Sequence, residues 1–122
     1  MKVIKQTETI SYSTAYQIAY QEYNIHKNLD HPNVVRCFSK TQTYCYDDST
    51  NDYVEATVLV LEYVQGGDLI QYLMQDGGFD EKVARFLFIQ LLNGLQHIHS
   101  KNISHLDLKL DNIFVDGDLD LA

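Results

Sequence analysis

The chain has 122 residues, of which 45% are hydrophobic, and its formal net charge is −8. This size fits one domain with one modest core, and the composition is that of a folded protein. The acidic balance, 17 Asp and Glu against 9 Lys and Arg, argues against nucleic acid or a membrane surface as the main partner. Residues 1–10 carry no apolar signal segment, and no apolar run approaches membrane-spanning length. Cys37 and Cys45 lack a metal-type or redox-type spacing, so we expect free thiols in a reducing, cytoplasmic compartment.

The first part of the chain predicts a strand followed by a helix. Residues 1–5 are partly apolar and β-branched, as in a short strand. Apolar residues then recur three or four positions apart over residues 14–29, which is the period of an amphipathic helix. We expect Ser13 or Thr14 to cap this helix. Pro32 excludes its continuation, because the residue before a proline disfavours the helical conformation.

A hairpin is predicted next. Residues 34–46 and 53–64 are rich in aromatic and β-branched side chains, and an acidic turn at residues 47–52 separates them. Gly66 and Gly67 mark the end of the second strand.

Two helices and a loop follow the hairpin. Asp68 is suited to cap a short helix that reaches about residue 75, and Asp80 is suited to cap a long helix over residues 81–100. Residues 103–112 read as a polar loop. Two short strands, at residues 113–115 and 119–121, are predicted around an Asp-Gly turn, a pair typical of tight hairpins.

The long helix is apolar over most of its surface, which is typical of a core helix. The chain offers too few other segments to cover all of these side chains. We therefore predict an exposed apolar patch on this helix, formed by Phe86, Phe88, Ile89 and Leu92.

The polar loop holds three groups that suit phosphoryl transfer, and His105 stands before them. Asp107 lies two positions after His105, and it can orient a hydroxyl and accept its proton late in a loose transition state. Lys109 carries a charge that offsets that of a phosphate. The amide oxygen of Asn112 is a hard ligand suited to Mg²⁺. Each residue alone fits a polar turn before a strand, but the four together at this spacing indicate a functional loop.

The order of elements and this loop resemble the protein kinase family, serine/threonine type. The likeness runs from the third strand of that fold, through a helix with a glutamate, a hairpin and a Gly-Gly link, to the catalytic loop. It implies an α+β, protein-kinase-like fold. Residues 1–64 are then an incomplete N-lobe, and residues 65–122 are the hinge, two helices and the catalytic loop of a C-lobe.

The resemblance also implies roles for residues of the loop. Asp107 matches the catalytic base, and Lys109 matches the lysine that meets the phosphate and the substrate hydroxyl. Asn112 matches the metal-binding amide. The cofactors implied are ATP and Mg²⁺, and the partner implied is a protein substrate.

Other positions match the nucleotide-binding residues of the family. Glu22 keeps the family's distance before the sequence His31-Pro32-Asn33, so it matches the helix glutamate, and Lys5 matches the third-strand lysine. In the hinge, Leu61 would be the gatekeeper, backbone groups of Glu62 and Val64 would bond adenine, and Asp68 would face the ribose. A strand exit and helix cap is the alternative reading of Asp68, and it is compatible with that role.

The chain departs from the family pattern in three places. Leu106 replaces the arginine that commonly precedes the catalytic Asp, so control by a phosphorylated activation loop is not expected. Active myosin light chain kinases share this His-Leu-Asp-Leu-Lys sequence, a weak pointer to the calmodulin-dependent group. No Gly-rich loop precedes Lys5, and the chain stops before an Asp-Phe-Gly sequence, so we expect a fragment.

Two functions follow from these departures. The first is phosphorylation of protein serine and threonine hydroxyls by a kinase of which this chain is a fragment, the chain alone being inactive. The alternative is a catalytically dead kinase-like module that acts by binding a partner kinase or the remainder of the domain.

Overall fold

The computed structural model describes residues 2–5 and 11–117, without the side chains of residues 3, 5, 75 and 76. The chain divides into two compact units. Unit 1 comprises Met1–Asp30 and Val35–Glu62, and unit 2 comprises His31–Val34 and Tyr63–Ala122. The α+β composition agrees with the predicted fold class.

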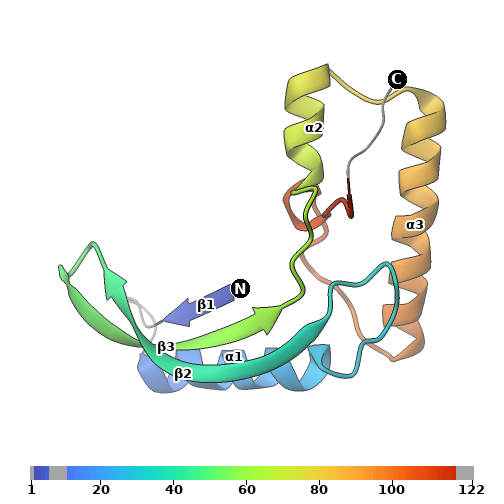
Figure 1. Cartoon of the computed structure of the whole chain (residues 1–122). Coiled ribbons are helices and arrows are strands. Elements are labelled where there is room, and N and C mark those ends of the chain that lie inside the picture. Colours follow the sequence, from blue (N-terminus) through green and yellow to red (C-terminus); the bar gives the residue numbers. More distant parts are fainter. Residues whose placement is uncertain (1, 6–10, 118–122) are drawn as a thin grey trace. The chain divides into compact units, whose positions relative to one another are not determined.

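Unit 1 contains a three-stranded antiparallel sheet of order β1-β3-β2 (Figure 1), formed by β1 (Lys2–Lys5), β2 (Cys37–Asp47) and β3 (Asp52–Leu61). The three strands predicted for this region are confirmed. Both hairpin strands are shorter than predicted at the ends away from the turn. The central strand, β3, is buried continuously over residues 56–59, because it has a paired strand on each side.

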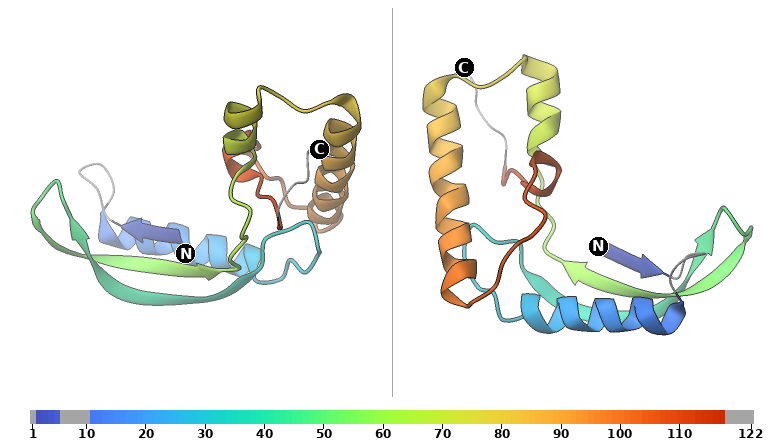
Figure 2. Two further views of the ribbon diagram at one scale, coloured as in Figure 1. Left: turned by 45° about the horizontal axis from the view of Figure 1, so that its top comes forward. Right: turned by 180° about the vertical axis from the view of Figure 1, so that it is seen from behind.

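Helix α1 (Tyr12–His26) packs against all three strands of the sheet (Figure 2). It begins two residues earlier than predicted, and the prediction of Ser13 or Thr14 as its cap is wrong. Ser11 is the cap, because its hydroxyl accepts from the backbone N–H of Thr14 at 3.3 Å. Two small residues, Ala15 and Ala19, are buried and allow the helix to approach the sheet closely.

Unit 2 contains α2 (Leu69–Asp76) and α3 (Glu81–Ser100). Both predicted N-caps are confirmed. The Asp68 carboxylate accepts from the backbone N–H of Gln71 at 3.1 Å, and the Asp80 carboxylate accepts from that of Val83 at 2.8 Å. These contacts satisfy backbone donors that the first turn of a helix leaves without intrahelical partners.

The apolar face of α3 is exposed, as predicted. The exposed fractions of its large apolar side chains lie between 46% and 60%, for Phe86, Phe88, Ile89 and Leu92. Only Gly94 and Ile98 are buried on this helix. No helix in the described part of the chain is both long and apolar enough to cross a membrane.

The segment after the polar loop has a pairing partner that was not predicted. Phe114 forms an isolated antiparallel bridge with Asp68, and the Leu69 N–H donates to Ile113 O at 2.8 Å. The segment 113–115 therefore binds the chain before α2. The strand predicted at residues 119–121 lies outside the described residues.

Candidate functional site

The loop after α3 brings the three predicted functional groups of unit 2 together. The Asn112 Nδ2 donates to the main-chain oxygen and to Oδ2 of Asp107, at 2.9 Å each. The Lys109 Nζ lies 3.2 Å from the same Oδ2. Asn112 reaches this position because the loop ends in a 3₁₀ turn, η1 (Leu110–Asn112), where a continuous loop was expected. Asp107 remains accessible, with 66% of its side chain exposed.

These contacts lower the pKa of the Asp107 carboxyl. The hydrogen bond from Lys109 is the largest cause, the hydrogen bond from Asn112 comes next, and the charges of Lys109 and His105 add to it. All of these groups favour the ionised form. The carboxylate is therefore negative at neutral pH and available to orient and accept a proton.

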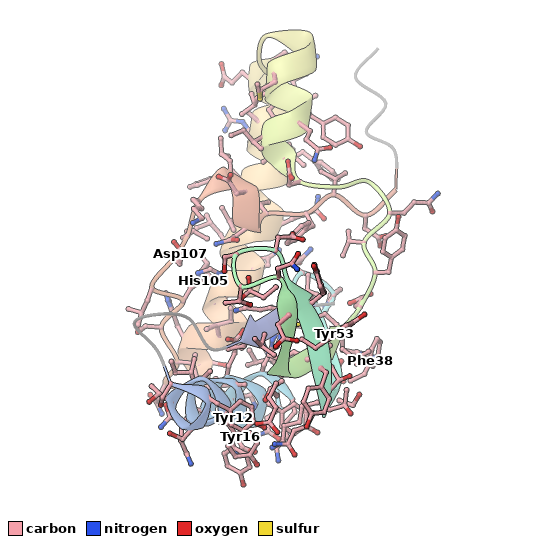
Figure 3. The ribbon with its side chains drawn as sticks, turned by 90° about the vertical axis from the view of Figure 1, so that its left-hand side faces the viewer. Tyr12, Tyr16, Phe38, Tyr53, His105 and Asp107 are labelled. Carbon is pink, nitrogen blue, oxygen red and sulfur yellow. The ribbon has the colours of Figure 1, made fainter. Side chains whose placement is uncertain are left out.

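A left-handed residue shapes the start of the loop. Leu106 has φ 63° and is 95% exposed. Positive φ is uncommon for a residue with a side chain, and it costs of order 1–3 kcal/mol. This turn lets the Asp107 N–H donate to His105 Nδ1 at 3.3 Å, and the two side chains lie near each other in Figure 3. This hydrogen bond closes a short turn around Leu106 and holds the backbone of Asp107 in place.

The amide of Asn112 is oriented by its own hydrogen bonds. Because its nitrogen donates twice to Asp107, its Oδ1 is the remaining group, and a carbonyl oxygen suits a hard cation. Within residues 2–5 and 11–117, no group of three or more His, Cys, Asp or Glu side chains lies close enough to hold a metal. Asn112, which the family pattern matches to a metal ligand, would therefore be one ligand of an incomplete set.

In unit 1, Glu22 forms an ion pair with a strand lysine that was not predicted. The Lys2 Nζ lies 2.6 Å from Glu22 Oε1, and this pair joins β1 to α1. The side chain of Lys5 lies outside the described residues. Among the described side chains, Lys2 is the ion-pair partner of Glu22, and the role expected of Lys5 stays a prediction.

The hinge residues differ in how their backbones are bonded. The Glu62 N–H donates to Arg36 O at 2.8 Å, and its carboxylate accepts from the Arg36 N–H at 3.0 Å. Among the described residues, neither the N–H nor the C=O of Val64 has a hydrogen bond. Val64 therefore keeps a free donor and a free acceptor on its backbone.

Asp68 has a structural role in unit 2. Besides the backbone N–H of Gln71, its carboxylate accepts from the side-chain Nε2 of Gln71 at 2.9 Å. Gly66 lies just before it, and a Cβ there would stand 2.4 Å from Val115 O. The absence of a side chain at position 66 lets this segment pair closely with residues 113–115.

Two residues with a place in these sites were missed from the sequence. Lys2 was missed because the short strand Lys2–Lys5 has a lysine at each end, and the motif match favours the second one. His105 was noticed but given no role. The sequence did offer a signal for this role, because His105 lies two residues before Asp107. A side chain at that position can accept a hydrogen bond from a backbone N–H across a turn.

Comparison with known proteins gives the same family for the whole chain. The protein kinase domain family matches residues 1–122. The chain is 34% identical over 118 residues to a probable serine/threonine-protein kinase of Dictyostelium discoideum, which covers 97% of this chain and 13% of that protein. It is 35% identical over 113 residues to the serine/threonine-protein kinase cds1 of Schizosaccharomyces pombe, with 93% of this chain and 22% of that protein covered.

A solved structure agrees with these relatives. The crystal structure of Rad53 in complex with AMP-PNP matches with a TM-score of 0.66 and 33% identity, over 82% of this chain and 24% of that chain. The chain spans less than a quarter of the length of each of these three proteins. It belongs to the protein kinase family and matches part of a serine/threonine kinase domain.

Proposed function

We propose that this chain is the part of an ATP-dependent protein serine/threonine kinase that carries the catalytic base. The observation that supports this most strongly is the loop at residues 105–112. There one carboxylate is held by an amide and an ammonium group, and its pKa is lowered while it stays exposed. The substrate class is a protein serine or threonine hydroxyl.

Asp107 is proposed as the base. A carboxylate with a lowered pKa is a weak base, so it acts mainly by orienting the hydroxyl and takes its proton late. Lys109 is proposed to reduce the negative charge on the transferred phosphoryl group. Its present contact with Asp107 holds its ammonium group at the carboxylate, where the hydroxyl would bind.

Asn112 is proposed as a ligand of Mg²⁺ through Oδ1, because its nitrogen is already committed to Asp107. The metal, when bound, would neutralise charge on the phosphates. Asp107 Oδ2 already accepts from Asn112 and Lys109, so its remaining oxygen, Oδ1, is the better candidate for the substrate hydroxyl.

For nucleotide binding we propose Lys5 and Glu22, the matches to the strand lysine and the helix glutamate of the family, with Lys2 as a further contact of Glu22. The ion pair of 2.6 Å supports the contact of Lys2. An ion-paired lysine keeps a fixed position from which it can also meet a phosphate.

The proposed adenine contacts are the backbone C=O of Glu62 and the backbone N–H and C=O of Val64. The free groups of Val64 support this role. Asp68 remains the proposed ribose contact, although its carboxylate oxygens already accept from Gln71. An ionised carboxylate has further lone pairs, so a ribose hydroxyl could share them.

The test uses the longest native form of the protein. Asp107→Asn is expected to remove phosphotransfer to a protein substrate, whereas Asp111→Asn, a nearby exposed acid, is expected to leave it. Retained turnover in Asp107→Asn would refute the assignment. A native form that transfers no phosphate but binds a second kinase would favour the non-catalytic alternative.

The two lysines are separated by the same assay. Lys5→Met is expected to impair nucleotide use strongly, and Lys2→Met weakly. The reverse order of effects would assign the nucleotide contact to Lys2.

A further inference from the structure

Helix α1 carries a second lysine contact besides the one at Glu22. The Nζ of Lys40, on β2, lies over three tyrosine rings of α1, at 5.1 Å from the centroid of Tyr16, 4.0 Å from Tyr20 and 5.8 Å from Tyr23. We refer to these four residues as the lysine–tyrosine cluster. An ammonium group within about 6 Å of an aromatic face is attracted by its quadrupole.

The strand register places the two lysines in one row across the sheet. Lys2 on β1 pairs with Leu59 on β3, and Lys40 on β2 pairs with the same Leu59 from the other side. Directly paired residues of antiparallel strands lie on the same face. Lys2 and Lys40 therefore flank Leu59, which is fully buried with no exposed surface.

The side chains of α1 that contact the two lysines lie on opposite sides of the helix. Ala15 and Ala19 are buried. With about 100° per residue, Glu22 lies about 60° to one side of Ala19. Tyr16 and Tyr20, each one residue after a buried alanine, lie about 100° to the other side. The glutamate flank meets Lys2, and the tyrosine flank meets Lys40.

We propose that Lys40 is a positioning residue for Glu22. Its contact with the tyrosine flank opposes rotation of α1 about its long axis, and so holds Glu22 against Lys2. The two attachments lie on opposite sides of the buried alanines. Loss of the Lys40 contact would therefore free the helix to turn and would weaken the Lys2–Glu22 pair. The effect on catalysis rests on the function proposed above, whereas the weakening of the Lys2–Glu22 pair does not.

Lys27 provides a matched control. Its Nζ lies 5.4 Å from the centroid of Tyr23, so it makes a similar cation–π contact. Lys27 caps the C-terminal end of α1, so its contact stays within the helix and joins no strand to it. Removing it should not change the position of the helix on the sheet.

Cys37 is a reporter of that position. It lies on β2 and is 7% exposed, and burial, followed by the charge of Glu22 on α1, raises the pKa of its thiol. In a Cys45→Ser background it is the only cysteine. The rate of maleimide labelling of Cys37 therefore reports how often the packing of α1 and β2 opens and exposes the thiol.

In this background, Lys40→Met is expected to raise the labelling rate on the order of threefold to tenfold, the range that a lost cation–π contact implies. Lys40→Arg, which can stack on the same rings, should restore the slow rate, and Lys27→Met should leave it unchanged. An unchanged rate in Lys40→Met, or an equal rise in Lys27→Met, would overturn the proposal. This arm needs no kinase activity, so it stands apart from the test of the proposed function.

The native kinase supplies a second arm through a double-mutant cycle. If Lys40 acts through Glu22, Lys40→Met lowers kcat/KM in the wild-type background and has little further effect in Glu22→Gln. A merely structural role would give equal losses in both backgrounds, and that result would overturn the positioning role.

Discussion

The side-chain nitrogen of Asn112 donates to two oxygens of Asp107, the main-chain oxygen and carboxylate Oδ2, at 2.9 Å each. One amide thus fixes both the backbone and the side chain of the proposed base. The residues are five positions apart, and the 3₁₀ turn at Leu110–Asn112 brings them together. The polar side chains of this loop therefore form hydrogen bonds with one another, in addition to being exposed to solvent.

The first prediction concerns the titration of Asp107. Its pKa is lowered chiefly by the hydrogen bond from Lys109, so the carboxylate is protonated at a lower pH than an unperturbed Asp. Lys109→Met should raise this pKa toward its ordinary value, and an activity that needs the carboxylate should then fall at a higher pH. A carbon-13 NMR titration of the Asp107 carboxyl measures the shift. Lys101→Met, which removes the same charge elsewhere, should leave the titration unchanged; a shift of equal size there would contradict the assigned cause.

A second prediction concerns Gly94, in the middle of α3. Alanine normally favours a helix over glycine by about 1 kcal/mol. At this position, however, a Cβ would stand 2.6 Å from the main-chain oxygen of Asn33, within unit 2. Gly94→Ala should therefore lower the free energy of unfolding, by about 1–3 kcal/mol as overpacking does. Urea denaturation of the chain measures this change.

The neighbouring site is the control for Gly94. Asn93 is exposed on the same helix, so Asn93→Ala gains helix propensity without a contact to disturb and should raise the free energy of unfolding slightly. If both alanine variants are stabilised, the close approach of Asn33 to the helix is wrong.

A third prediction concerns His97. Its ring stacks on that of His31 with centroids 5.0 Å apart, and its Nε2 is buried without a hydrogen-bond partner among the described residues. A buried polar group without a partner costs about 1–3 kcal/mol. His97→Phe keeps an aromatic ring in the stack and removes the polar atom, so it should raise the free energy of unfolding. His99→Phe, at an exposed position of the same turn, should not; a destabilised His97→Phe would show that Nε2 has a partner such as water.

A fourth prediction concerns the Cys37 thiol. Burial is the main cause of its raised pKa, and the Glu22 carboxylate adds to it because a nearby negative charge disfavours the thiolate. Glu22→Gln should therefore lower the pKa of Cys37 while leaving it above the ordinary value. The ultraviolet absorbance of the thiolate, followed against pH in a Cys45→Ser background, measures it. A pKa that does not fall would mean that Glu22 lies farther from Cys37 than described.

Much of the architecture was determined locally by the sequence. The boundaries of α3 at Glu81 and Ser100, and the caps Asp68 and Asp80, follow from short-range rules: a capping carboxylate and a helical repeat of apolar residues. The loop residues Asp107, Lys109 and Asn112 could be named in advance because their contacts join positions at most five apart.

Tertiary structure decided what depends on residues far apart in the chain. Lys2, an ion-pair partner of Glu22, lies twenty positions away, and the pairing of β1 with β3 brings it to the helix. The row of Lys2, Leu59 and Lys40 likewise exists only once three strands have paired. Segment 113–115 pairs with the chain before α2 through backbone hydrogen bonds. No local sequence pattern predicts which backbone groups will pair in this way. Local periodicity and caps fix the elements, whereas contacts between residues far apart in the chain, such as that of Lys2 with Glu22, require the strands to pair.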